Sequence, residues 1–104
     1  MIQIKNPQHY REVTANDLVL VDFYGITCAP CKIYAKELEK VAYDLPFVTV
    51  AKVCTDEQPE LSDAFKINAV PTSYLYKNGE IVERFTGTKK VADVEKLLAK
   101  YLYE

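Results

Sequence analysis

The sequence predicts an α/β domain whose mixed sheet carries helices on both faces, and two patterns lead to this class. Apolar runs of strand length alternate with segments of helical periodicity over most of the 104 residues. Near the end of the chain, an Asn78-Gly79 pair separates two β-rich runs, which is a strong signal for an antiparallel hairpin. We therefore expect parallel strands joined by right-handed crossovers, followed by antiparallel strands.

The first elements are short. Ile2 and Ile4 alternate with polar residues and predict a short strand at a sheet edge. Asn6 is placed to cap a helix that has Pro7 at its first position and that ends near Thr14.

Three longer elements follow. The run Leu18–Tyr24 is almost continuously apolar, which is typical of a central strand buried on both faces. Helical spacing of apolar residues predicts a helix over Cys31–Tyr43, and β-rich residues predict a second buried strand over Phe47–Cys54. Each strand contains one charged residue, Asp22 in the first and Lys52 in the second.

The last third contains a helix that Pro59 opens and that runs through Phe65, then a loop and the hairpin. The hairpin strands are predicted around Tyr74–Tyr76 and over Ile81–Phe85, and an amphipathic helix is predicted over Val91–Tyr103.

Length and composition indicate one domain, 1–104. The net charge of −2 provides no basic footprint for nucleic acid or for an anionic membrane. No run is long enough to span a membrane, and the first residues lack a charged segment followed by a long apolar one. We therefore expect a cytoplasmic protein without a signal peptide, and a monomer.

Cys28 and Cys31 lie where the central strand meets the long helix. A helix N-terminus favours a thiolate, because its N–H groups lack intrahelical partners and its dipole is positive. Cys28 is the N-cap candidate, its sulfur within reach of the Cys31 N–H, and Pro30 suits the first turn. The two sulfurs are therefore inequivalent, with Cys28 exposed and activated and Cys31 more buried. One can attack a disulfide and the other can resolve the mixed disulfide.

A zinc site is the alternative for this pair, but zinc needs four ligands and the other candidates are only Cys54 and His9. A Cys-x-x-Cys pair beside a βαβ pattern instead indicates redox chemistry, with no metal and no other cofactor. We expect Cys54 to be a small buried residue. The alternative is a regulatory thiol that is open to oxidation.

Asp22 is a carboxylate within an apolar strand, which is costly unless the group is paired or neutral. Side chains alternate along a strand, so Asp22 shares a face with Leu20 and Tyr24, and Lys52 of the neighbouring strand is its obvious partner. Two interpretations remain. The pair is either a buried ion pair that fixes strand register, or Asp22 is a base whose pKa burial raises toward the operating pH.

Six segments, in this order and spacing, resemble the thioredoxin family over essentially the whole chain. They are Val21-Asp22-Phe23-Tyr24, Cys28-Ala29-Pro30-Cys31-Lys32, Val50-Ala51-Lys52-Val53, Val70-Pro71-Thr72, Lys77-Asn78-Gly79-Glu80 and Gly87. The resemblance implies the thioredoxin fold, a central mixed five-stranded sheet flanked by four helices. It also implies a protein-disulfide reductase.

In that family role, Cys28 would attack a substrate disulfide and Cys31 would release the reduced product, leaving a Cys28–Cys31 disulfide. A thioredoxin reductase would return this disulfide to the dithiol. Asp22 would accept the proton of Cys31 and return it later, with Lys52 as the second charged group of the catalytic set.

The resemblance also implies a surface for substrate contact, made by Thr27, Ala29, Pro30, Val70, Pro71 and Gly87. Pro71 matches the family's cis-proline beside the sulfurs, and Val70 would pair its backbone with a substrate peptide. Gly87 would let the substrate backbone approach closely. The family usually has Trp and Gly in place of Thr27 and Ala29, so these two residues bear on the range of substrates.

A glutaredoxin-like protein and a binding module on the same fold are the alternatives. Glutaredoxins usually have Pro directly after the first cysteine and a Gly-Gly pair, whereas here Ala29 follows Cys28 and the chain has no Gly-Gly. Pro30 stands where disulfide-forming oxidants usually have His, which favours a reductant. A binding module would hold a partner in either redox state, with negligible turnover by a reductase.

Overall fold

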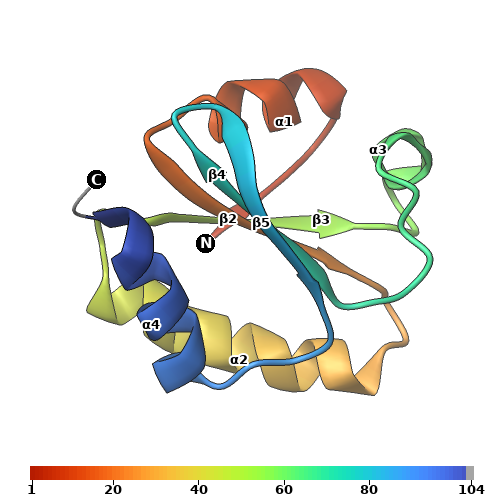
Figure 1. The fold of residues 1–104 in the computed structure, drawn as a ribbon. Helices are drawn as coiled ribbons and strands as arrows, with labels where there is room; N and C mark the ends of the chain where they lie inside the picture. Colours follow the sequence, from red (N-terminus) through yellow and green to blue (C-terminus); the bar gives the residue numbers. More distant parts are fainter. Residues whose placement is uncertain (103–104) are drawn as a thin grey trace.

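The computed structural model describes residues 1–102, and its elements follow the predicted order (Figure 1). They are β1 (Ile2–Gln3), α1 (Pro7–Thr14), β2 (Leu18–Tyr24), α2 (Ala29–Asp44), β3 (Thr49–Cys54), α3 (Pro59–Ala64), β4 (Thr72–Lys77), β5 (Glu80–Thr86) and α4 (Val91–Leu102). The strands form one sheet in the order β1-β3-β2-β4-β5. β1, β3 and β2 pair in parallel, whereas β4 pairs antiparallel with both β2 and β5. The predicted mixed five-stranded sheet with four helices is confirmed.

The start of β3 was predicted too early, at Phe47. The strand begins at Thr49, because the Val48 N–H donates to the Leu45 carbonyl at 3.0 Å and closes a turn there. Phe47 is left 63% exposed. A β-rich composition indicates a strand, but a local turn bond decided where pairing with the sheet could start.

The bounds of two helices also differ from the prediction, and the end of a third is not described. α2 begins at Ala29 instead of Cys31, and α3 ends at Ala64 with Phe65 as its C-cap. α4 is described as far as Leu102, so the predicted end at Tyr103 lies outside the described residues. None of the helices within residues 1–102 combines the length and apolar character that a membrane crossing requires.

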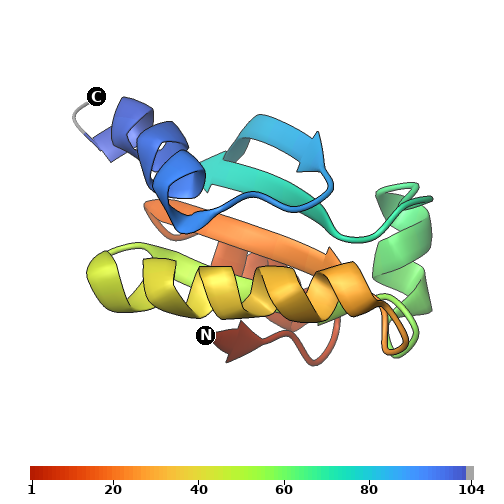
Figure 2. The same cartoon turned by 90° about the horizontal axis from the view of Figure 1, so that it is seen from below.

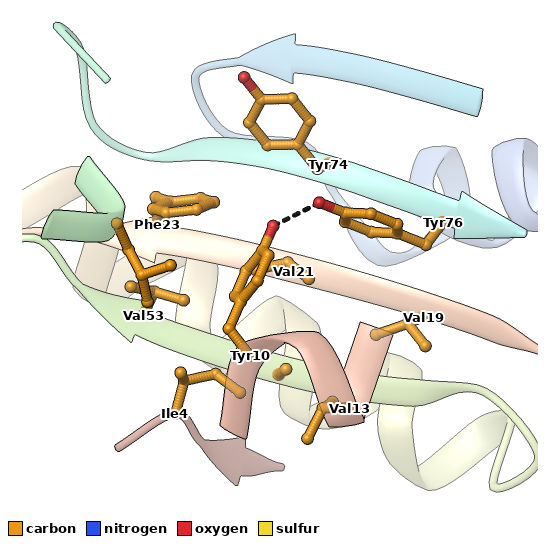
Figure 3. Close-up of a cluster of buried hydrophobic side chains, with 11 residues drawn as sticks. Ile4, Tyr10, Val13, Val19, Val21, Phe23, Val53, Tyr74 and Tyr76 are labelled. Atoms are coloured by element: carbon orange, nitrogen blue, oxygen red, sulfur yellow. Dashed lines mark hydrogen bonds between the residues drawn. The ribbon is translucent and has the colours of Figure 1, made fainter. Parts of the chain in front are cut away.

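Helices cover both faces of the sheet, as Figures 1 and 2 show, with α1 and α3 on one face and α2 and α4 on the other. Alternation along β2 sends Val19, Val21 and Phe23 into the first core and Leu18 and Leu20 into the second. In the first core, Tyr10 of α1 and Tyr76 of β4 join their hydroxyls at 2.6 Å (Figure 3). The central strand is therefore buried on both faces, as its apolar run predicts.

Candidate active site

The junction between β2 and α2 brings Cys28 and Cys31 into a disulfide, with their Cα atoms 5.2 Å apart. Cys28 is the N-cap of α2 in an extended conformation, and its Sγ accepts a hydrogen bond from the Cys31 N–H at 3.1 Å. Pro30 lies in the first turn. The predicted cap geometry is therefore confirmed.

The two sulfurs differ in their access to solvent. Cys28 is half-buried, whereas Cys31 is only 2% exposed. In the dithiol form, the same N–H donor and the positive helix end stabilise a thiolate on Cys28. This arrangement suits an outer thiol that meets a substrate disulfide and an inner thiol that reacts within the protein.

The loop before β4 lies against the outer sulfur. The Val70–Pro71 peptide bond is cis, as predicted, and the Cys28 Sγ lies 3.8 Å from the Val70 carbonyl oxygen. The Gly87 N–H donates to the Pro71 carbonyl at 2.8 Å, which brings the end of β5 to the same place. Gly87 has a φ of +86°, in the left-handed region that favours glycine. The structure thus brings Val70, Pro71 and Gly87 together beside the disulfide.

The surface around the disulfide is open. Thr27, Ala29 and Pro30 are exposed, as expected of residues that touch a substrate. Two apolar side chains that the sequence analysis did not single out flank the cysteines along the chain and are exposed, Ile26 at 55% and Ile33 at 64%. Exposed apolar side chains next to a reactive group suit contact with another protein.

The sequence analysis also did not identify Asp56 as a site residue. Asp56 holds the loop before the cysteines. Its Oδ2 accepts a hydrogen bond from the Ile26 N–H at 2.8 Å and lies 4.0 Å from the Cys54 Sγ. Asp56 follows the carboxyl end of β3, next to the carboxyl end of β2. Sites of open α/β sheets gather at that edge, so its position along the chain was the available signal. Cys54 is a free thiol with 1% exposure, which confirms the predicted burial.

Asp22 is fully buried on β2, six residues before Cys28, at 0% exposure. It lies directly opposite Lys52 of β3 and Ser73 of β4 in the sheet. Among the residues that the structure describes, none donates a hydrogen bond to either carboxylate oxygen of Asp22. Desolvation raises the pKa of Asp22 from 3.8 to about 7, and the Lys52 charge opposes this rise.

Lys52 does not form the direct ion pair that was one interpretation of the sequence. Within residues 1–102 the salt bridges are Lys40–Glu37 and Lys77–Asp17, and neither involves this lysine. The Lys52 Nζ instead lies 4.6 Å from the centroid of the Tyr24 ring. The sequence placed the lysine in the correct register, but its long side chain extends to Tyr24, the last residue of β2.

Comparison with known proteins identifies a family for this chain. The family model described as Thioredoxin matches residues 1–100. The chain is 38% identical over 101 residues to a thioredoxin of Chlamydia muridarum, and the match covers 97% of this chain and 99% of that protein. It is also 39% identical over 93 residues to the mitochondrial thioredoxin of Mus musculus, which covers 88% of this chain and 56% of the relative.

Solved structures agree with these relatives. The X-ray structure of Fasciola hepatica thioredoxin superimposes with a TM-score of 0.88 at 26% identity, covering 97% of this chain and 99% of that one. A mutant thioredoxin from Halobacterium salinarum gives a TM-score of 0.90 at 32% identity, covering 96% of this chain and 88% of that one.

Proposed function

Because the chain belongs to the thioredoxin family and is a protein-disulfide reductase, we propose that Cys28 is its attacking thiol and Cys31 its resolving thiol. The observation that carries this assignment is the difference between the two sulfurs. The half-buried Cys28 Sγ caps α2 and faces the Val70 carbonyl, whereas Cys31 is inside the helix.

The reaction transfers two electrons in two exchange steps. The Cys28 thiolate attacks one sulfur of the substrate disulfide, forming a mixed disulfide and releasing the first substrate thiolate. Cys31 then loses its proton and attacks the Cys28 sulfur, which forms the Cys28–Cys31 disulfide and releases the second substrate thiolate. The substrate gains two electrons and the protein dithiol loses them.

Asp22 is proposed as the base that takes the proton of Cys31, through a water molecule. A base works best when its pKa lies near the operating pH, and burial raises the pKa of Asp22 to about 7. Lys52 is proposed as the charge that keeps this pKa from rising further, because it favours the carboxylate. When the disulfide is reduced again, the proton returns from Asp22 to Cys31.

The proposed substrate is an extended peptide next to a disulfide. Val70 offers a backbone N–H and C=O that no other backbone group within residues 1–102 uses, so a short β-like pairing is open to it. Thr27, Ala29, Pro30 and the Pro71–Gly87 corner would flank the peptide. We propose that a thioredoxin reductase supplies the electrons, and that residues 1–104 act as one domain, as a monomer in the cytoplasm.

Trapping of mixed disulfides tests the assignment. Cys31→Ser should accumulate substrate on Cys28, because no second thiol resolves the bond, whereas Cys28→Ser should neither trap nor reduce substrate. Cys54→Ser is the matched control and should turn over like the parent, since Cys54 is buried away from the substrate. Capture by Cys28→Ser instead would reverse the two roles. Binding of partners in both redox states, without turnover by a reductase, would show a binding module.

A further inference from the structure

A pair of buried hydroxyls lies next to Asp22. The Tyr34 hydroxyl of α2 and the Ser73 Oγ of β4 are 2.8 Å apart, and both residues are 0% exposed. Ser73 is the direct antiparallel partner of Asp22, so the two side chains point to the same face of the sheet. Tyr34 lies over this level of the sheet, because its ring also packs edge-on against Phe85, the partner of Ser73 on β5.

Hydrogen-bond accounting connects this pair with Asp22. Two hydroxyls carry two hydrogens, and their mutual bond uses only one of them. Within residues 1–102, neither Tyr34 nor Ser73 makes another side-chain hydrogen bond, so one hydrogen is left over. Asp22, across the strand pair, has two buried oxygens that accept none. Buried polar groups are nearly always paired, so an unused donor beside unused acceptors points to a shared bond.

We propose that the Tyr34–Ser73 pair is a positioning device for Asp22, in which Ser73 donates to the ionised carboxylate while Tyr34 donates to Ser73. The proposal rests on the proposed role of Asp22 as a base. Directly opposite Cβ atoms in an antiparallel pair are about 5 Å apart, so rotation of Ser73 about χ1 brings its Oγ to the carboxylate. With Asp22 protonated, Ser73 no longer donates to the carboxyl and the two hydroxyls pair only with each other, as they do in the structure.

Electrostatics agree with this proximity. Burial raises the pKa of Tyr34, the bond with Ser73 lowers it, and the Asp22 charge raises it. Charged or titratable groups on this side of the sheet include Lys52 and Cys54 of β3, Tyr24 of β2, Glu83 of β5 and Cys31 on the buried side of α2. Lys52 acts on Asp22 from β3, the strand on one side of β2. Ser73 is the neighbour of Asp22 on β4, the strand on the other side.

Titration of Asp22 by carboxyl carbon NMR tests the proposal, and the oxidised protein is used so that Cys28 and Cys31 do not titrate. A hydrogen bond to a charged group favours the charged form, so Ser73→Ala should raise the midpoint of Asp22 by about one pH unit. Tyr34→Phe should raise it less, because Ser73 can still donate. Ser73→Thr keeps the hydroxyl and should restore the parent midpoint.

Tyr10→Phe is the matched control, because it breaks an equivalent buried hydroxyl pair on the other face of the sheet (Figure 3). It should leave the midpoint of Asp22 unchanged. An unchanged midpoint in both Ser73→Ala and Tyr34→Phe, or an equal rise in Tyr10→Phe, would overturn the proposal. If Ser73→Ala does not fold, Tyr34→Phe decides alone by the same criterion.

Kinetics separate this proposal from the one on which it rests. In Ser73→Ala, the pH profile of the Cys31 resolving step should move up with the Asp22 midpoint, about tenfold in rate on its rising limb for a shift of one unit. A parent-like resolving rate in Asp22→Asn would remove the base role of Asp22. The NMR midpoints would still decide whether the hydroxyl pair acts on the carboxyl.

Discussion

Replacement of Asp22 by Asn should make the protein more stable at neutral and alkaline pH. The folded-state pKa of about 7 lies above the ordinary value of 3.8, so the folded protein holds the proton longer than the unfolded chain does. The stabilising contribution of that proton is complete below the unfolded pKa and is lost as the pH rises through the folded one. At about 1.36 kcal/mol for each pH unit, ionised Asp22 destabilises the parent by about 4 kcal/mol above pH 7.

The assay is denaturant unfolding of the parent and of Asp22→Asn from about pH 4 to about pH 9. At the acidic end both side chains are neutral and the two free energies of unfolding should be similar. The advantage of the variant should grow as the pH rises and level off above about 7. Asp63→Asn, at an exposed site, is the control and should follow the parent. A difference that stays flat over the range, or a variant that is less stable at neutral pH, would refute the reasoning.

Three further outcomes are expected. Alkylation of the native oxidised protein should leave Cys54 unlabelled until denaturant is added, because the thiol is 1% exposed, and rapid labelling would contradict its burial. Asp56→Ala should lower the free energy of unfolding by about 1 kcal/mol through loss of the bond that holds the loop before the cysteines. An equal loss in Asp63→Ala would remove that explanation. Lys52→Met should raise the pKa of Asp22 above the parent value, and NMR titration with an unchanged or lower midpoint would exclude the proposed action of the lysine.

Much of the site could be predicted from the sequence because its determinants are local. The cap at Cys28 depends on a sulfur and an N–H three residues apart, so the sequence predicts the 3.1 Å bond with Cys31. The alternation along β2 likewise places Asp22 on a buried face. The cis bond at Pro71 came from the resemblance to a family, since a proline alone favours trans.

The parts that were missed depend on contacts between distant segments. The Tyr34–Ser73 bond depends on the register of β4 against β2 and on how α2 packs against the sheet. Helical spacing alone identifies Tyr34 only as a core residue. Asp56 reaches the Ile26 N–H only because two strand ends lie side by side. The direct Asp22–Lys52 ion pair, one of the two interpretations of the sequence, does not form for a related reason, since register fixes the backbone but not the end of a long side chain.

A single-turnover reduction measures the central claim most directly. The dithiol form of the protein is mixed with a protein disulfide in excess, with no reductase present, and both products are counted by mass spectrometry. One Cys28–Cys31 disulfide should form for each substrate disulfide reduced, with a Cys28-linked mixed disulfide as the transient species. Absence of reduction, or formation of the intramolecular disulfide without two new substrate thiols for each, would contradict the account.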